Sequence, residues 1–158
     1  MKIIILGSTG ILARTLNLYL RNKNVDVLTI SRERNNNKNF NLKNFLNFKK
    51  LENLIFTIKP THIINCIGVT KFNNTYNNKK LTVSLNSKMP IYLAKYCRLN
   101  KIYLLHISTD CVFSGKKGNY LDNSVKDSKD LYGLSKNKGE VNNEYTSTIR
   151  TSFIGPEL

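Results

Sequence analysis

The opening of the chain constrains its fold most, because an aliphatic run there meets a glycine turn and then an amphipathic helix. Residues 3–6 are isoleucine or leucine throughout, which is typical of a strand buried on both faces of a parallel sheet. The turn consists of Gly7, Ser8, Thr9 and Gly10. Apolar residues then recur at helical spacing, at Ile11, Leu12, Leu16 and Leu20. The sequence therefore predicts a strand, a tight turn and a helix in immediate succession.

The rest of the chain alternates between strand and helix patterns. Further buried strands are predicted at residues 25–30, 62–67, 102–108 and 147–150, and helices at 45–58, 81–99 and 131–141. Pro60 ends the second helix, and Pro90 is expected to kink the third or to lie near its first turn. Polar stretches at 33–41 and 115–130 are predicted as loops. This alternation predicts one α/β domain over residues 1–158, a doubly wound, Rossmann-like parallel sheet.

Composition limits the size of the core, the chemistry of the cysteines and the compartment in which the chain is expected. With 158 residues and 41% hydrophobic composition, it is long enough to bury one core. Its three cysteines, Cys66, Cys97 and Cys111, are widely spaced in apolar surroundings, so neither a disulfide framework nor a zinc site is predicted. No apolar run approaches the ~20 residues that span a bilayer, and the first strand is too short for a signal segment. A cytoplasmic protein without a membrane partner is expected.

The charge of the chain is strongly positive, with a formal net charge of +15 at pH 7. Such a charge attracts anionic ligands such as nucleotides, and it attracts nucleic acid non-specifically. Lysines and asparagines are spread over every segment and do not gather with aromatic residues on one face. No specific nucleic-acid partner is therefore expected.

The glycine turn has two readings. Between a buried strand and a helix, Gly7 and Gly10 let the backbone approach a pyrophosphate at the helix N-terminus, with Ala13 in the third, helix-packing position. The same turn is also found as a tight connection with no ligand. After the second strand, where an acidic residue would bind the ribose of NAD, the chain has Ser31 and Arg32. Arg32 favours the 2′-phosphate of NADP, although a solvated arginine at a loop start is the plain alternative.

Three further side chains suggest hydride-transfer chemistry. Tyr132 and Lys136 are four residues apart and share one helix face, where an ammonium group lowers the pKa of a phenol and makes it a better proton donor. A Tyr–Lys pair at this spacing is also common on structural helices. Thr109 ends the fourth strand, where it could bind a substrate carbonyl or simply cap the strand. His62 and His106 lack ligand partners at metal-binding spacing and are given no role.

These motifs together resemble the extended short-chain dehydrogenase/reductases, in particular the dTDP-4-dehydrorhamnose reductase branch. The resemblance runs almost end to end. It is carried by Gly7-Ser8-Thr9-Gly10, Asn65-Cys66-Ile67-Gly68, Asn86, the segment from Ser108-Thr109-Asp110 to Ser114-Gly115, Tyr120, Tyr132-Gly133-Leu134-Ser135-Lys136, Gly139-Glu140 and Ile149-Arg150-Thr151-Ser152.

The resemblance implies a role for each site residue. Thr109 orients the sugar carbonyl, Tyr132 donates the proton, and Lys136 holds the nicotinamide ribose and lowers the pKa of the tyrosine. The cofactor is NADP, with NAD as the alternative. Its binding residues are Gly7, Ser8, Thr9, Gly10, Ile11, Leu12, Ser31, Arg32, Asn41, Leu42, Cys66, Ile67, Gly68, Tyr132 and Lys136. The partners implied are a nucleotide sugar and a second copy of the chain in a homodimer.

The sequence also departs from the family pattern. Ala13 replaces the usual third glycine, Cys111 replaces a tyrosine, and Asn41 stands where aspartate is common. Family members continue beyond the point matching Leu158, so this chain is expected to be the cofactor-binding part of a reductase of 4-keto-6-deoxy nucleotide sugars, used in surface polysaccharide synthesis. A nucleotide-sugar epimerase or dehydratase is the first alternative. A non-catalytic binding subunit, like the regulatory subunit of methionine adenosyltransferase, is the second.

Overall fold

A single parallel sheet organises the structure, a computed structural model that describes residues 1–31, 46–73 and 76–152. Its strand order is β2-β1-β3-β4-β5, and every neighbouring pair is parallel. The strands are β1 (Lys2–Leu6), β2 (Asp26–Ile30), β3 (His62–Asn65), β4 (Tyr103–Thr109) and β5 (Thr146–Thr151). The expected doubly wound parallel sheet is thus confirmed.

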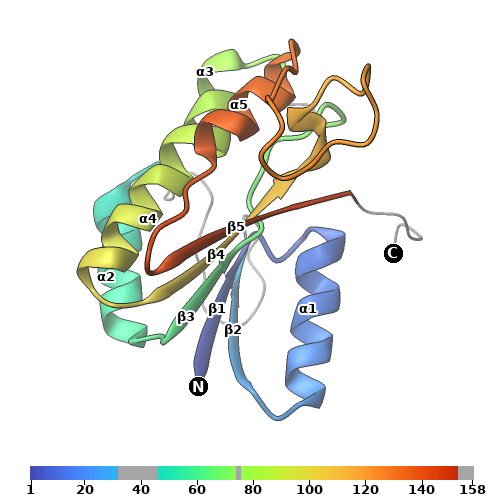
Figure 1. Ribbon diagram of the computed structural model, residues 1–158. Helices are drawn as coiled ribbons and strands as arrows, with labels where there is room; N and C mark the ends of the chain where they lie inside the picture. Colours follow the sequence, from blue (N-terminus) through green and yellow to red (C-terminus); the bar gives the residue numbers. More distant parts are fainter. Residues whose placement is uncertain (32–45, 74–75, 153–158) are drawn as a thin grey trace.

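The helices cover the two faces of the sheet unequally (Figure 1). Of the helices in the described residues, α1 (Ile11–Asn22) alone lies on one face, while α2, α4 and α5 lie on the other. The bounds on that second face are α2 (Phe48–Ile58), α3 (Lys79–Val83), α4 (Met89–Leu99) and α5 (Leu131–Gly139). A right-handed crossover places its helix on one face of the sheet when the chain moves to one side, and on the other face when it moves to the opposite side. The connection from β1 to β2 moves to one side and the connection from β2 to β3 moves to the other, so α1 and α2 lie on opposite faces. The side on which successive strands are added to the sheet therefore reverses between β1 and β3.

The long third helix is interrupted by a π-helical turn, η2 (Ser84–Lys88), between α3 and α4. Pro90 lies two residues after this turn and has no N–H for the carbonyl of Asn86, four residues earlier. The N–H of Met89 instead donates to the carbonyl of Ser84, five residues back. The disturbance that Pro90 was expected to cause thus takes the form of a local widening of the helix just before the proline.

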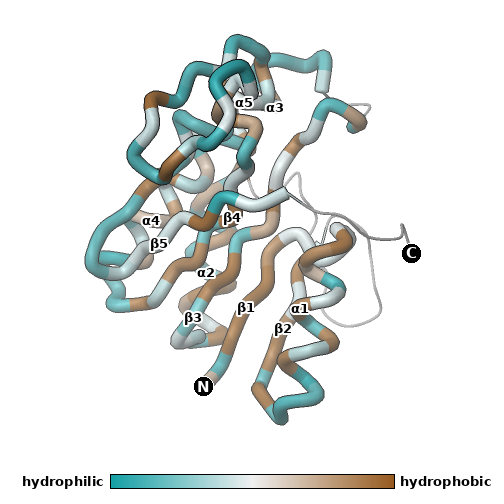
Figure 2. Tube along the Cα trace, turned by 45° about the vertical axis from the view of Figure 1, so that its right-hand side comes forward, coloured by the Kyte–Doolittle hydropathy of each residue, from teal (hydrophilic) through white to brown (hydrophobic). Residues whose placement is uncertain are grey.

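Two apolar clusters flank the sheet. The larger one joins Ile4, Leu6 and Ile63 of the strands to Leu51 and Leu93 of α2 and α4. The smaller one places Ile3, Ile5 and Ile64 against Ala13 of α1. Apolar colour runs along β1 in Figure 2, in agreement with a strand buried on both faces. This alternation of faces fixes the register of the sheet.

Most element boundaries fall within a few residues of those predicted. The strand predicted at 62–67 ends at Asn65, because the chain then turns away from the sheet to line a cavity. The predicted loop over 33–41 lies wholly outside the described residues. In the described ranges, no helix is long and apolar enough to cross a membrane. No cluster of three or more histidine, cysteine or acidic side chains that could hold a metal occurs in them either.

Candidate functional site

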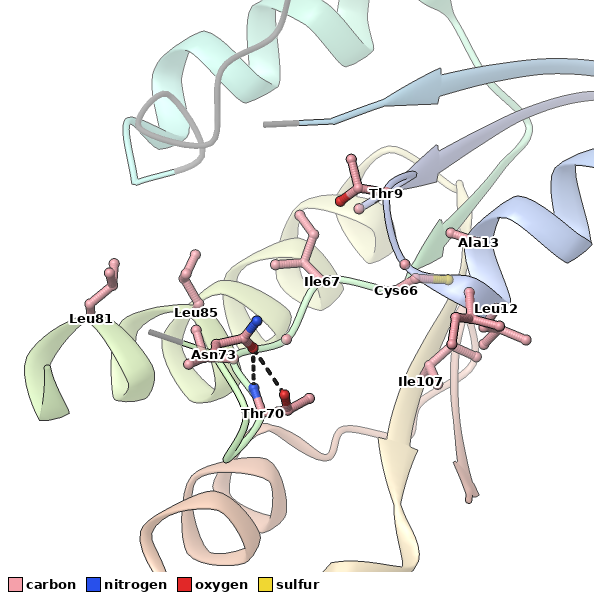
Figure 3. A pocket seen from close by; sticks show the side chains of 15 residues that line it. Thr9, Leu12, Ala13, Cys66, Ile67, Thr70, Asn73, Leu81, Leu85 and Ile107 are labelled. Atoms are coloured by element: carbon pink, nitrogen blue, oxygen red, sulfur yellow. Dashed lines mark hydrogen bonds between the residues drawn. The ribbon is translucent and has the colours of Figure 1, made fainter. Parts of the chain in front are cut away.

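A cavity of about 410 Å³ opens at the carboxyl ends of β1 and β3, where the strand order reverses. Such a reversal point is where open α/β sheets usually bind ligands. Figure 3 shows the cavity between the start of α1, at Leu12 and Ala13, and the long helix, at Leu81 and Leu85. Its lining includes these predicted cofactor residues: Gly7, Thr9, Gly10, Ile11, Leu12, Cys66, Ile67 and Gly68.

Gly7 is required by the protein itself. Its φ of +86° lies in the left-handed region, which side chains other than glycine rarely adopt. A Cβ there would lie 3.0 Å from the backbone nitrogen of Ile67, which belongs to the segment after β3. The N–H groups of Gly7 and Ser8 both donate to the carbonyl of Ile30, at distances of 2.9 and 3.2 Å. The turn is thus held against β2 and β3 at once.

Gly10 differs, because none of the described residues demands a glycine there. Its φ of −74° and ψ of 151° are open to any residue, and a Cβ would have Gly7 O, 3.7 Å away, as its nearest described neighbour. The residue nevertheless lines the cavity and precedes α1, whose first turn has no acidic residue and no side-chain cap. The free N–H groups of that turn and the positive end of the helix dipole therefore lie beside an open space.

The opposite wall of the cavity is fixed by Asn86, in the π-helical turn. Its side chain is fully buried; its Oδ1 accepts from the N–H of Val69 at 2.8 Å, and its Nδ2 donates to the carbonyl of Val69 at 2.9 Å. Nδ2 also donates to the Ser135 hydroxyl of α5 at 3.0 Å. One amide thus joins the segment after β3 to α5, and a π-helical turn is a frequent feature of functional sites.

Several lining residues were missed by sequence reasoning, namely Val69, Thr70, Asn73, Leu81, Leu85 and Ile107. Thr70 and Asn73 form a turn in which the Asn73 Oδ1 accepts from the N–H and the hydroxyl of Thr70, drawn as dashed lines in Figure 3. Asn86, in the helix after β3, is the residue from which this wall of the cavity could have been predicted. It was assigned to the family pattern but not to the site.

Thr109 lies at the end of β4, where it was predicted. Its side chain is buried, and its Oγ1 accepts from the N–H of Cys111 at 3.2 Å, which starts the short 3-10 turn η3 (Asp110–Val112). The strand-cap reading of Thr109 is therefore realised in the structure. The same hydroxyl also lies within hydrogen-bonding reach of the Tyr132 phenol. Thr109 and Tyr132, which are 23 positions apart in the sequence, thus meet at one edge of the sheet.

The pKa of Tyr132 is opposite to the sequence expectation. Burial raises the pKa of this phenol above its ordinary value, and the Thr109 hydrogen bond and the Lys71 ammonium offset only part of that rise. Lys136 is not among the groups that lower the pKa of Tyr132. Its Nζ donates to the carbonyl of Ile107 at 2.7 Å. The phenol consequently keeps its proton at neutral pH, as a proton donor must.

Lys136 is the most deeply buried charged side chain of the site, with 3% of its surface exposed. Burial lowers its pKa to about 8, and the nearby Glu140 carboxylate opposes this lowering. Its Nζ lies 3.8 Å from the point where a Cβ on Gly68 would stand. The ammonium group is therefore placed beside the floor of the cavity.

Two glycines let α5 approach this site. A Cβ on Gly139 would lie 2.0 Å from the carbonyl oxygen of Asn86, and a Cβ on Gly133 would lie 2.1 Å from the Ser128 hydroxyl. Glycine normally weakens a helix interior, so its presence here reflects close packing. Asp130 starts the helix by accepting from the N–H of Gly133 at 2.9 Å.

A buried ionic network anchors the other end of α5. The Glu140 carboxylate, 4% exposed, accepts from Arg150 at 2.9 Å on both of its oxygens and from Lys126 at 2.7 Å. It also accepts from the Ser108 hydroxyl at 2.7 Å. Burial alone would raise its pKa, but these hydrogen bonds outweigh burial and lower the pKa to about 2. The network ties α5 to β4, to β5 and to the long loop before α5.

The remaining residues predicted to bind the cofactor do not line the cavity or lie outside the described residues. Ser31 is buried at the end of β2, close to the glycine turn but not in the cavity lining. Arg32, Asn41 and Leu42 lie outside the described residues. The structure thus brings the turn, the segment after β3 and the end of β4 together, with Tyr132 and Lys136 of α5 beside them.

Comparison with protein families gives one match over nearly the whole chain. The model described as "RmlD substrate binding domain" matches residues 1–154. A dTDP-4-keto-6-deoxy-D-glucose reductase of Streptomyces niveus is 29% identical over 138 residues, and methionine adenosyltransferase 2 subunit beta of Danio rerio is 29% identical over 140 residues. These matches cover 87% and 88% of this chain but 45% and 42% of the relatives. The chain therefore spans about half the length of the curated relatives it matches.

Solved structures agree with these relatives. A hypothetical dTDP-4-dehydrorhamnose reductase from Sulfolobus tokodaii superposes with a TM-score of 0.84 at 28% identity, over 95% of this chain and 55% of that one. A dTDP-4-dehydrorhamnose reductase from Bacillus anthracis, solved in complex with NADP, gives a TM-score of 0.73 at 25% identity, over 88% of this chain and 48% of that one.

Proposed function

This chain belongs to the family described as RmlD substrate binding domain, and from that premise we propose that it forms the cofactor-binding half of an NADPH-dependent reductase. The substrate is a 4-keto-6-deoxy nucleotide sugar, of the kind used to build surface polysaccharides. Relatedness to NAD(P)-dependent reductases is carried by the family match, and the substrate class follows from the printed names of the reductase relatives.

The observation that carries the proposal is the contrast between the two glycines of the turn. Gly7 is explained by backbone geometry and by contact with Ile67, whereas Gly10 meets no such constraint from the described residues and lines the cavity. A pyrophosphate bound to the first turn of α1 accounts for a residue without a side chain at that point. The uncapped N–H groups supply hydrogen bonds, and the helix dipole favours the negative charge.

The residues present fit a nicotinamide dinucleotide. The turn and the start of α1 would hold the pyrophosphate, the segment after β3 would pack against the cofactor, and Lys136 would hold the nicotinamide ribose. When bound, this cofactor supplies the hydride. The choice of NADP over NAD rests on Arg32 in the sequence and on the Bacillus anthracis relative, solved with NADP.

The chain's own side chains supply the proton and the orientation. Thr109 would donate a hydrogen bond to the sugar carbonyl, and Tyr132 would transfer its phenolic proton to the developing alkoxide. Burial keeps that phenol protonated at neutral pH, which suits reduction of a ketone. Positioning of the reacting groups and acid catalysis are thus both assigned to residues at the end of β4 and the start of α5.

A second candidate is a non-catalytic, cofactor-binding subunit. It is favoured by the similarity to methionine adenosyltransferase 2 subunit beta, which equals that of the reductase relative in identity. The fold and the cavity serve either function. Thr109, Tyr132 and Lys136 are all present, and this favours the reductase.

Two measurements test the proposal. Titration of the chain with NADPH and with NADH should give at least about tenfold tighter binding of NADPH, because an arginine that pairs with the 2′-phosphate contributes about 1.4 kcal/mol or more. Arg32→Ala should remove the preference and leave NADH binding unchanged. Equal affinity for the two cofactors would contradict the assignment of NADP.

The second measurement separates the reductase from the subunit. In a chain completed with the second half of a reductase relative, NADPH consumption with a dTDP-4-keto-6-deoxy sugar should be lost in Tyr132→Phe, while NADPH binding stays unchanged. Binding without consumption in the completed parent chain would favour the non-catalytic subunit.

A further inference from the structure

One ion pair crosses from the wall of the cavity to the helix that carries the predicted proton donor. The Lys71 ammonium lies 2.9 Å from the Asp130 carboxylate. Lys71 directly follows Thr70, which lines the cavity in the segment after β3. Asp130 is the N-cap of α5 and stands two residues before Tyr132. The ion pair therefore joins the cavity wall to the start of the helix on which the phenol is placed.

Hydrogen bonds fix both ends of this ion pair. The Asn73 Oδ1 accepts from the N–H of Thr70 at 2.6 Å and from its hydroxyl at 3.1 Å, and both residues line the cavity (Figure 3). At the other end, the Asp130 Oδ1 accepts from the N–H of Gly133 at 2.9 Å, while its Oδ2 contacts Lys71. One carboxylate thus caps α5 and holds the cation at the same time.

The stability of the fold does not account for this ion pair. The Lys71 and Asp130 side chains are 47% and 40% exposed, and ion pairs between exposed side chains contribute little to the free energy of folding. Asp130 would cap α5 without Lys71, since its hydrogen bond to the Gly133 N–H needs no cation. The effect of the cation must therefore be sought in the site beside it.

The Tyr132 phenol lies within the electrostatic reach of this cation. Burial has the largest effect on the phenol and raises its pKa, while the hydrogen bond with Thr109 lowers the pKa. Of the neighbouring charged and titratable groups, Asp110 and Cys111 raise the pKa of the phenol, and the Lys71 ammonium lowers it. A positive charge lowers the pKa of a phenol because it stabilises the phenolate.

Lys136, the cation expected from the sequence to act on the phenol, makes a different contact. Its Nζ donates to the carbonyl of Ile107 and lies beside Gly68, in the lining of the cavity. The sequence gave Lys136 two tasks, which are to hold the nicotinamide ribose and to stabilise the phenolate. The position of Lys136 fits the first task, and the position of Lys71 fits the second.

We propose that Lys71 is a positioning residue of the reductase, held by Asp130 where its charge stabilises the phenolate that Tyr132 becomes when it gives up its proton. In that step the phenolic O–H bond breaks and a new O–H bond forms on the sugar oxygen, while the carbonyl carbon receives a hydride from NADPH. Lys71 keeps its own proton, and its ammonium group balances the negative charge left on the phenol. The inference rests on the proposed function, because Tyr132 is a proton donor only in the reductase.

Titration of the side chain at position 132 tests the effect of the charge. Difluorotyrosine is incorporated in place of Tyr132 in the 158-residue chain, because fluorine lowers the pKa of the phenol and gives one ¹⁹F signal that reports this residue alone. Lys71→Met should move the midpoint of this titration to higher pH, and Lys71→Arg, which keeps the charge, should restore the parent midpoint. Lys129→Met is the matched control and should leave the midpoint unchanged, since Lys129 is exposed beside Asp130 and carries the same charge.

Three results of these titrations would overturn the proposal. The first is an equal midpoint in the parent chain and in Lys71→Met. The second is an equal rise in Lys71→Met and Lys129→Met, which would make net charge the cause. The third is a large loss of thermal stability in Lys71→Met, which would show that the ion pair serves the fold.

Kinetics of the completed chain test the consequence for the reaction. Lys71→Met should lower kcat at pH 7 about tenfold, because a weaker acid transfers its proton more slowly, and Lys71→Arg should recover most of the loss. The Kd for NADPH should stay at the parent value, since Lys71 is not part of the cavity lining in the described residues. A loss of NADPH affinity with kcat unchanged would assign Lys71 to cofactor binding and would overturn the proposal.

Failure of this proposal is distinguishable from failure of the proposed function. If the completed parent chain consumes NADPH while Lys71→Met leaves the midpoint at position 132 unchanged, the reductase stands and the role of Lys71 is rejected. If the completed parent chain does not consume NADPH, the reductase is rejected, and the role of Lys71 with it, whatever the midpoints are.

Discussion

The ammonium nitrogen of Lys136 lies 3.8 Å from the point where a Cβ on Gly68 would stand, so a charged side chain of α5 reaches the floor of a cavity formed by β1 and β3. Gly68 belongs to the segment after β3 that lines the cavity. The approach depends on the close packing of α5 through Gly133 and Gly139. Lys136, on the same helix as the predicted proton donor Tyr132, is thereby brought close to the lining of the cavity.

Lys136→Met should weaken NADPH binding about 10- to 100-fold, because hydrogen bonds from a charged donor contribute about 1.5–3 kcal/mol. Isothermal titration of the variant with NADPH measures this loss. Lys138→Met is the matched control, since Lys138 lies on the same helix but is exposed. Equal loss in both variants would show that net charge, and not the position of Lys136, governs binding.

Gly7→Ala and Gly10→Ala should behave oppositely. Gly7→Ala forces a Cβ onto a backbone with φ +86° and against Ile67, which costs about 1–3 kcal/mol of unfolding free energy. Gly10→Ala meets no described atom closer than 3.7 Å and should leave the unfolding midpoint nearly unchanged while it weakens NADPH binding. Thermal unfolding and NADPH titration of both variants check the pair. Loss of stability without loss of binding in Gly10→Ala would contradict the assigned role.

The alternation of strands and helices could be read from the sequence because hydrophobic periodicity reports burial directly. The third strand was predicted two residues too long, since Cys66 and Ile67 are as apolar as a strand but line the cavity. The π-helical turn before Pro90 could not be predicted as such, because a missing N–H predicts a disturbance but not its form. Periodicity also gave no sign that Gly139 passes the carbonyl of Asn86.

Part of the cavity lining could be predicted from the sequence, but the electrostatics of the neighbouring side chains could not. Residues of the turn and of the segment after β3 line the cavity as expected, because the carboxyl ends of parallel strands meet at one edge. The pKa of Tyr132 was predicted with the wrong sign. Spacing on a helix says that Tyr132 and Lys136 share a face, but it does not say that Lys136 donates to Ile107 or that the phenol is buried.

Glu140→Gln should remove an acid-sensitive part of the stability. The folded pKa of Glu140 is lowered from 4.5 to about 2, so its contribution is present above pH 4.5 and is lost as the pH falls toward 2. At pH 7 the variant should therefore be less stable by about 2–3 kcal/mol, and the difference should shrink toward pH 2. Urea unfolding at pH 7 and pH 3 measures both values. Glu144→Gln, at an exposed ion pair with Arg98, is the control and should change little.

His106 should remain neutral well below the pH at which histidine normally titrates. Burial lowers its pKa to about 3, and the nearby Lys136 ammonium lowers it further than the Glu140 carboxylate can restore. Its Nδ1 accepts from the Asn65 side-chain amide at 3.1 Å, because the Asn65 Oδ1 already accepts from Ile67 N–H. Ring ¹⁵N chemical shifts at pH 5 should therefore show the neutral Nε2–H tautomer. A histidine of ordinary pKa would be largely protonated at pH 5. An imidazolium signal from His106 in the folded protein at that pH would therefore contradict the lowered pKa.

The most direct test of the central claim is a hydrogen-exchange footprint of NADPH on the 158-residue chain. The account predicts saturable, one-to-one binding that slows amide exchange in the glycine turn, in the first turn of α1 and in residues 66–70. The aromatic row of His62, Tyr103 and Tyr145 should be unaffected. Absence of saturable binding, or protection spread over the basic surface without the glycine turn, would contradict the account.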